Sequence, residues 1–257
     1  MPAVIPYFQQ PSLSIGPFTL HGFGVLVALA VFLGMKLLHK RAAEVGLEER
    51  NVARFIGWVL LGALAGAHLI DRFVYFPAQT LRDPMSIVRV WEGLSSFGGF
   101  VGGTLSGIVF FRRHANPGTL WKLTDCFAYA FSFAWILGRM GCFVAFDHPG
   151  RETTFFLSET YKDGVVRHNL GLDEALYTVL IAALFWVLGR KPRFPGFFVG
   201  LFILVYAPFR FIVDFLRIVD VRYFHLTPGQ YGCIAFMIGG ALILWTQRHN
   251  PPHVVKA

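Results

Sequence analysis

Two arginines stand near the ends of long apolar segments. Arg139 lies between glycines in Gly138-Arg139-Met140-Gly141, close to the end of one apolar run, and Arg210 lies in another. An unpaired guanidinium in hydrocarbon is costly, so each arginine needs a partner or a function. For Arg139 one possible partner is Asp147 or Asp214. Two cations at one level repel unless an anion lies between them, and guanidinium groups bind phosphate through paired hydrogen bonds. The two arginines therefore predict a phosphate site, with a phospholipid as the most obvious donor of the phosphate.

The segment around Arg210 carries further polar residues at helical spacing. Tyr206, Arg210, Asp214 and Arg217 follow one another at intervals of four, four and three residues. Side chains at such intervals share one face of a helix. Asp214 can pair with Arg210 or with Arg217, so an ion-pair ladder inside the protein is the alternative to ligand binding.

Several histidines are expected on the same side of the molecule as the arginines. His21 opens the first apolar segment, His68 lies near the end of the second, and His148 and His168 lie in a polar loop. A histidine at a membrane interface is usually an ordinary hydrogen-bonded residue. A proton acceptor for a thiol or a hydroxyl would nevertheless come from this group.

The composition is that of an integral membrane protein. Of the 257 residues 55% are hydrophobic and only 15% are charged, whereas soluble domains are about 25% charged. The net charge of +8 fits the Lys and Arg that collect in cytoplasmic loops, so we predict a lipid bilayer as the surroundings and no nucleic-acid partner. The three cysteines show neither a disulfide framework nor a zinc spacing, and we predict no metal or cofactor.

Seven apolar segments are long enough to cross a membrane as helices. Lys and Arg are more frequent in the loops on the side of the C-terminus, which places the N-terminus outside and the C-terminus in the cytoplasm. We predict an all-α integral membrane protein with about seven transmembrane helices, forming a single domain over residues 1–257 with an outer loop insertion at about 147–171. The predicted segments are His21–Leu38, Val52–Phe73, Leu94–Phe111, Thr124–Phe146, Leu172–Leu188, Gly196–Leu216 and Gly229–Trp245.

These segments place the two arginines at one depth. Counted from the cytoplasmic ends of their helices, Arg139 lies roughly 22 Å and Arg210 about 21 Å into the membrane at 1.5 Å per residue. The hydrocarbon core is about 30 Å thick, so both guanidinium groups should lie in its outer half.

Glycines recur at four-residue spacing in two segments, as Gly62 and Gly66 and as Gly98 and Gly102. Such series usually mark close helix–helix contacts in membranes. Gly98 and Gly99, at the predicted outer mouth, would also let the backbone approach a ligand.

At these residues the chain resembles the prolipoprotein diacylglyceryl transferases, bacterial enzymes that attach lipid to a cysteine. Residues 138–151 align without a gap on the family signature G-R-x-G-N-F-x-N-x-E-x-x-G-R, and residues 209–217 match F-R-x-x-x-E-F-x-R. Further similarity covers Ser14–Pro17, Leu20–Gly24, Arg89–Ser95 with Trp91 and Glu92, the pair Gly98-Gly99, and Gly229-Gln230.

The resemblance implies transfer of a diacylglyceryl group from phosphatidylglycerol to the lipobox cysteine thiol of a lipoprotein precursor, in the bacterial cytoplasmic (inner) membrane. It implies catalytic roles for Arg139, Arg210 and His21. The residues that it implies for substrate binding are Gly98, Gly99, Asp147, Gly150, Tyr206, Asp214 and Arg217.

The chain departs from the family pattern at several positions. Cys142 and Ala145 stand where the signature has asparagine, and Asp147 stands where it has glutamate. Phe97 stands where the family has a histidine before the paired glycines. The stretch from Glu92 to Gly98 is one residue short, so that histidine is either replaced or deleted. In both cases His21, His148 or His168 would have to accept the proton. The family motif H-P-S-Q-x-Y-E is reduced to the segment His168–Glu174.

These departures leave a second hypothesis open. The chain could be a paralogue with the same fold that binds phospholipid without catalysis or transfers lipid to a different acceptor. A transporter would instead require broken helices at mid-depth, and the predicted position of the charges on the outer side argues against one.

Overall fold

The computed structural model describes residues 5–15, 18–90, 93–114, 117–218 and 220–252. The motif residues Gly16, Pro17, Trp91 and Glu92 lie outside these ranges.

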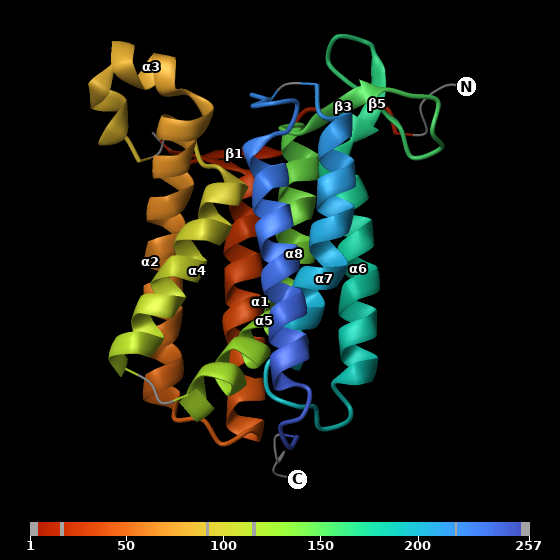
Figure 1. The fold of residues 1–257 in the computed structure, drawn as a ribbon. Coiled ribbons are helices and arrows are strands. Elements are labelled where there is room, and N and C mark those ends of the chain that lie inside the picture. The colour runs from red at the N-terminus through yellow and green to blue at the C-terminus, as the bar shows by residue number, and fades with distance from the viewer. Residues whose placement is uncertain (1–4, 16–17, 91–92, 115–116, 219, 253–257) are drawn as a thin grey trace.

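Seven helices of 17 to 29 residues dominate the described part of the chain and alternate in direction along a bundle (Figure 1). Each coincides with one of the predicted apolar segments. The first and the last described segments of the chain lie at opposite ends of the bundle (Figure 1). The seven helices are α1 (Gly22–Glu44), α2 (Glu49–Ile70), α4 (Ser96–His114), α5 (Pro117–Ala145), α6 (Leu170–Leu188), α7 (Phe197–Val213) and α8 (Pro228–Gln247).

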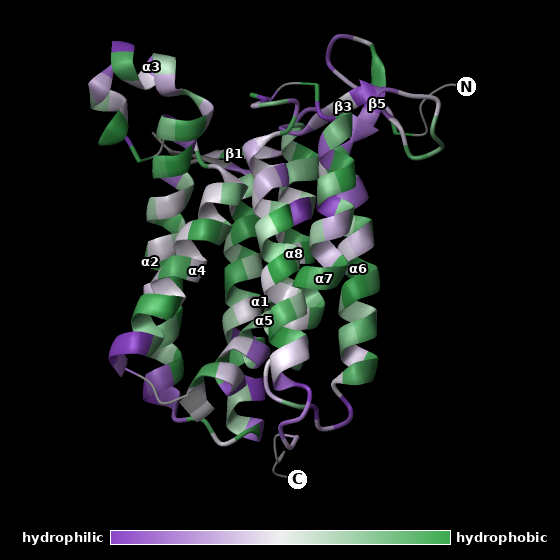
Figure 2. Ribbon diagram, in the orientation of Figure 1, coloured by the Kyte–Doolittle hydropathy of each residue, from purple (hydrophilic) through white to green (hydrophobic). Residues whose placement is uncertain are grey.

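Apolar residues fill the middle of the bundle, and polar residues gather at its two ends (Figure 2). Within the described residues six helices have the length and composition to cross a membrane, namely α1, α2, α5, α6, α7 and α8. The protein is therefore a multi-pass membrane protein. Helix α4 forms where a span was predicted, but it is not among the six, since its glycines and its terminal Arg112 and Arg113 make it less apolar.

Short elements cover the end of the bundle near the N-terminus, which we call the strand end (Figure 1). The loop predicted at about 147–171 contains a small antiparallel sheet, so the all-α prediction missed short strands. The sheets are β1 (Ser12–Ile15) with β2 (Phe18–His21), and β3 (Pro149–Glu152), β5 (Val166–Asn169) and β4 (Glu159–Thr160) in that spatial order. The other short elements are the π-turn Asp71–Tyr75, α3 (Pro77–Arg82), and the 3₁₀ turns Pro84–Ile87 and Asp214–Leu216.

Glycines bring α2 and α4 into close contact, as their spacing predicted. A Cβ atom added to Gly102 would lie 2.1 Å from the carbonyl oxygen of Gly62, and one added to Gly98 would lie 2.3 Å from that of Gly66. Real Cβ atoms do not approach so closely, so only glycine allows this packing of the two backbones.

Aromatic and aliphatic side chains pack α5, α6 and α7 against one another. Phe185 on α6 and Phe198 and Phe202 on α7 are buried in one cluster with Ala128 of α5 and the ring of Tyr206. This core fixes the relative positions of the three helices that carry Arg139, Glu174 and Arg210.

Candidate functional site

A buried carboxylate lies between the two arginines. Glu174 Oε2 is 3.0 Å from Arg139 Nη2, and Glu174 Oε1 is 3.6 Å from Arg210 Nε. The side chains of Glu174 and Arg139 are each only 1% exposed. The anion expected between the arginines is thus supplied by the protein itself. The pairing of Arg139 with Asp147 or Asp214 that we considered is wrong, since its ion-pair partner in the described chain is Glu174.

The local sequence explains how Glu174 reaches this position. Asn169 caps the start of α6, where its side chain accepts hydrogen bonds from the N–H groups of Gly171 (3.0 Å) and Leu172 (3.3 Å). Its amide also donates to the carbonyl oxygen of Phe143 on α5 at 3.2 Å. This cap holds the first turn of α6 beside the last turns of α5. Glu174 therefore enters the bundle at the level of Arg139.

Aromatic residues and a cysteine complete the surroundings of Arg139. The guanidinium lies over the ring of Trp135, 4.6 Å from its centroid, and Nη1 is 3.7 Å from Cys142 Sγ. Tyr206 Oη accepts a hydrogen bond from Trp135 Nε1 at 3.0 Å and donates one to Glu174 Oε2 at 2.5 Å. Removed from water in this way, the ion pair between Arg139 and Glu174 is stronger than it would be at the surface.

Helix α7 carries the ion-pair ladder that its residue spacing predicted. Asp214 Oδ1 is 2.6 Å from Arg210 Nη1 and 3.6 Å from Arg217 Nη1. Arg217 Nη1 is also 3.0 Å from Asp220 Oδ2. Thr227, the N-cap of α8, donates a short hydrogen bond to the second oxygen of Asp214. The ladder therefore ties the end of α7 to the start of α8.

His148 is the histidine that the structure brings to the arginines. Its Nδ1 lies 3.3 Å from Arg217 Nη2 and 3.5 Å from Asp147 Oδ1. Burial and the positive charges of Arg139 and Arg217 lower the pKa of His148 well below its ordinary value, so the ring is neutral at neutral pH. Burial raises the pKa of Asp147 to about 6, although Arg139 and Arg217 act in the opposite direction.

The other histidines lie elsewhere. His21 ends β2 and precedes α1, with an exposed side chain and, within the described residues, no hydrogen bond or ion pair to the arginine cluster. His68 is buried under the loop before α4, where Nε2 is 2.9 Å from the carbonyl oxygen of Ile87. His168 Nδ1 lies 3.4 Å from Asp173 Oδ2. The structure thus places His21 away from the site, and its catalytic role stays a prediction.

Two of the predicted substrate-binding glycines face a neighbouring helix. Gly98 and Gly99 lie against α2, and a Cβ added to Gly99 would meet Ala63 and Ala67 at ordinary contact distances. Their packing role is confirmed, whereas their contact with a ligand remains a prediction.

Gly150 has a different structural role. A Cβ added there would lie 2.7 Å from the Cβ of His168, and the backbone of Gly150 forms a bridge with that of Arg217. Only a glycine lets strand β3 pass between β5 and the end of α7. Gly150 therefore helps to position Arg217. This structural role explains why residue 150 of the signature segment is a glycine.

Phe97 lies in the first turn of α4 and packs across the bundle. A Cβ added to Gly232 of α8 would lie 2.0 Å from Phe97 Cε2, so the phenyl ring presses on the backbone of α8. Phe97 thus forms an aromatic contact between α4 and α8.

One cluster in the described residues has the donor types of a metal site. Ligand atoms of Cys142, Asp147 and His148 lie within 4.8 Å of one another. The guanidinium groups of Arg139 and Arg217 contact Cys142 and His148, respectively. Two positive charges at the cluster oppose the binding of a cation. The donor set therefore does not favour a metal, and a metal-free, cofactor-free site remains our prediction.

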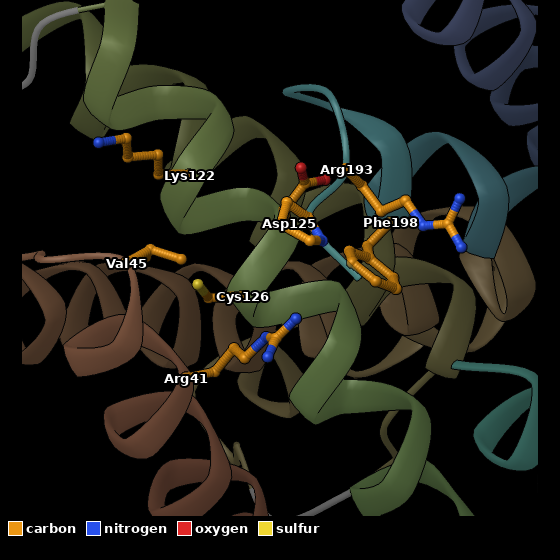
Figure 3. Close-up of a pocket in the computed structure, with 8 residues that line it drawn as sticks. Arg41, Val45, Lys122, Asp125, Cys126, Arg193 and Phe198 are labelled. Carbon is orange, nitrogen blue, oxygen red and sulfur yellow. The ribbon is translucent and has the colours of Figure 1, made fainter. Parts of the chain in front are cut away.

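A small cavity of about 20 Å³ lies at the other end of the bundle (Figure 3). Asp125, which lines it, accepts hydrogen bonds from the N–H groups of Gly196 (2.8 Å) and Val199 (3.1 Å). Arg41 donates to the carbonyl oxygen of Gly189 at 2.9 Å. These charged groups satisfy helix ends. Asp125 lies on α5 roughly 21 Å from Arg139 at 1.5 Å per residue, and Arg41 lies near the end of α1. Both residues belong to the framework of the bundle.

Sequence reasoning missed Glu174 and Trp135 as members of the site. Glu174 was recognised only within a reduced motif at the start of an apolar segment. A carboxylate inside such a segment needs a cation as much as an arginine needs an anion. Pairing the buried charges of opposite sign would have found it.

The comparisons with known proteins agree with the geometry. The family model described as "Prolipoprotein diacylglyceryl transferase" matches residues 10–246. The phosphatidylglycerol–prolipoprotein diacylglyceryl transferase of Azotobacter vinelandii is 30% identical, with 95% of this chain and 97% of the relative covered. That of Glaesserella parasuis is 31% identical, with 93% and 92% covered, and that of Chromohalobacter salexigens is 29% identical, with 95% and 94% covered. The chain therefore belongs to the prolipoprotein diacylglyceryl transferase family.

Proposed function

We propose that the protein transfers the diacylglyceryl group of phosphatidylglycerol to the lipobox cysteine thiol of lipoprotein precursors. The observation that carries the proposal is the row formed by Arg139, Arg210 and Arg217 at the strand end of the bundle. Relatives that share the length of this chain are named for phosphatidylglycerol and prolipoproteins. A row of guanidinium groups is suited to a phosphate that gains charge during reaction.

The proposed reaction needs positive charge beside the leaving phosphate. The sulfur of the acceptor attacks the glycerol carbon that bears the phosphate, so that a C–S bond forms and a C–O bond breaks. The electron pair of the broken bond leaves with glycerol phosphate, whose single negative charge becomes two. Guanidinium groups held in place by Glu174 and Asp214 stabilise this second charge without reorganising.

The thiol proton needs an acceptor, for which we propose His148. It is the one of the three predicted histidines that contacts an arginine of the row, Arg217. Its neutral ring has one nitrogen that can accept a proton, and Asp147 beside it can stabilise the charge that forms. His21 and His168 are the alternatives that the sequence left open.

We propose that all seven long helices cross the bacterial cytoplasmic membrane and that residues 1–257 form one domain. Their alternating directions and the opposite positions of the first and the last described segments support this topology (Figure 1). The excess of Lys and Arg on the side of the C-terminus favours that side as cytoplasmic. The strand end, with the sheet β3-β5-β4, then faces outward, and α4 crosses despite its lower hydropathy.

The alternative is a paralogue that binds phospholipid but does not catalyse the transfer. The departures from the family pattern at Cys142, Ala145 and Phe97 favour it, since Phe97 cannot accept a proton. Nothing in either proposal involves nucleic acid.

Complementation separates the two proposals. The chain is expressed in a bacterium that is depleted of its own transferase, with Arg210→Ala as the matched variant. Growth and lipoprotein lipidation with the unaltered chain, and neither with Arg210→Ala at equal expression, is the expected result. Failure of the unaltered chain despite good expression and membrane insertion would select the non-catalytic paralogue.

A further inference from the structure

The arginines of the row differ in what can reach them. The side chain of Arg139 is 1% exposed, whereas those of Arg210 and Arg217 are 14% and 16% exposed. Arg139 is enclosed by Glu174 and by the ring of Trp135. An anion that approaches from outside therefore meets Arg210 and Arg217 before it meets Arg139.

The two oxygens of Glu174 are also held differently. Oε2 has short contacts with Arg139 (3.0 Å) and Tyr206 (2.5 Å). Oε1 lies 3.6 Å from Arg210 Nε, which is beyond hydrogen-bond distance, and accepts no hydrogen bond. The carboxylate is thus firmly bound on its Arg139 side and loosely bound on its Arg210 side.

From these two asymmetries we infer that Arg210, together with Arg217, contacts the substrate phosphate, and that Arg139 is a positioning residue that holds Glu174 beside Arg210. This inference rests on the proposed function and gives the two arginines of its site different roles. The substrate phosphate replaces Glu174 Oε1 at Arg210, while Glu174 stays on Arg139 and Tyr206. Asp214, 2.6 Å from Arg210 Nη1, keeps the guanidinium in place during the exchange.

Binding of a phosphate by conservative variants tests the division. Purified protein in detergent is titrated calorimetrically with glycerol phosphate, and folding of each variant is checked by its melting temperature. Arg210→Lys should weaken binding about tenfold or more, since a paired guanidinium contact is lost. Arg139→Lys should leave the affinity within about threefold of the unaltered protein. Equal losses in the two variants would overturn the inference.

A headgroup and a free phosphate share this chemistry, so the titration is repeated with phosphatidylglycerol in mixed micelles. Arg210→Lys should again lose more affinity than Arg139→Lys. The opposite order for the lipid would show that Arg139 contacts the headgroup, and would overturn the inference for the substrate.

Chemical modification of the unaltered protein gives a test that does not depend on whether variants fold. An arginine-selective dicarbonyl reagent is applied with and without inorganic phosphate, and the modified residues are identified by mass spectrometry. Arg210 should react and be protected by phosphate, Arg139 should not react, and the exposed Arg54 at the other end should react in both cases. Protection of Arg139, or none of Arg210, would contradict the inference.

These readouts measure anion binding and not lipid transfer. Preferential protection of Arg210 combined with failed complementation would refute the proposed reaction alone. Successful complementation combined with phosphate protection of Arg139 would refute the division of roles alone.

Discussion

Arg139 and Glu174 form a buried ion pair, and the effects of removing them should not add. The combined variant should lose less unfolding free energy than the sum of the losses in the two single variants. The change is a double-mutant cycle of Arg139→Met, Glu174→Gln and the combined variant. Methionine keeps an unbranched side chain in the space of the arginine, and glutamine keeps an acceptor for Tyr206.

The size of the effect follows from the geometry. The two charges lie 3.0 Å apart with 1% of each side chain exposed. At an effective dielectric constant of about 20, opposite charges at this distance attract by roughly 5 kcal/mol. Glu174→Gln leaves the guanidinium of Arg139 buried without its counter-ion, which typically costs about 3–5 kcal/mol. Arg139→Met leaves Glu174 with only its longer contact of 3.6 Å to Arg210. In the combined variant no unpaired charge remains, so its loss should fall short of the sum by at least about 2 kcal/mol.

Reversible unfolding in sodium dodecyl sulfate, followed by tryptophan fluorescence, measures the four free energies of unfolding. The pair Arg41–Glu44, whose side chains are 16% and 30% exposed, is the control. Its coupling should be about 1 kcal/mol or less, because water still reaches Glu44 and screens the pair. Additive losses in the Arg139–Glu174 cycle would refute the view that Glu174 neutralises Arg139.

Three further predictions concern the outer sheet, the helix contact and the family departure. Burial raises the pKa of Glu159, in β4, to about 7. Between pH 4.5 and about 7 the folded state therefore keeps a proton that the unfolded chain loses, so the melting temperature should fall as the pH rises through this range. Glu159→Gln should reduce this fall. An unchanged pH profile of the melting temperature in the variant would contradict the assignment. Gly102→Ala places a Cβ 2.1 Å from the carbonyl oxygen of Gly62 and should cost about 1–3 kcal/mol of unfolding free energy. The control Gly103→Ala, whose Cβ would have its nearest contact at 3.6 Å, should cost less than about 0.5 kcal/mol. Equal costs would refute the close contact of α2 and α4. Phe97→His should leave lipid transfer unimpaired, because an imidazole is smaller than the ring that now presses on α8, and a large loss in a transfer assay would show that the site is built around the phenyl ring.

Much of the fold could be predicted because it depends on local apolar composition. Each apolar segment became one long helix, and the glycine series of Gly62, Gly66, Gly98 and Gly102 marked the contact between α2 and α4. The strands β3, β4 and β5 could not be predicted in this way. They are two to four residues long, and their pairing depends on contacts with Arg217 and the start of α6.

The site was predictable where its residues share one helix. Tyr206, Arg210, Asp214 and Arg217 follow a helical period, and the ladder they form was expected. The partner of Arg139 comes from another helix, α6, and sequence spacing alone does not give the register of two helices. That register depends on the cap by Asn169 and its bond to α5.

The sequence also could not show which histidine enters the site. The resemblance favoured His21, whereas the structure brings His148 to Arg217. Both residues were expected at the same end of the bundle, and which of them enters the site depends on the path of loop 147–169. That path is fixed by β3 and by Gly150, and no periodicity in the sequence reports it.

The most direct measurement of the central claim is the transfer reaction itself. Purified protein is incubated with labelled phosphatidylglycerol and a lipobox peptide, and the products are identified by mass spectrometry. We expect a thioether-linked diacylglyceryl peptide and glycerol phosphate in equal amounts, and neither product with Arg210→Ala. Binding of phosphatidylglycerol without any thioether product would contradict the proposed reaction.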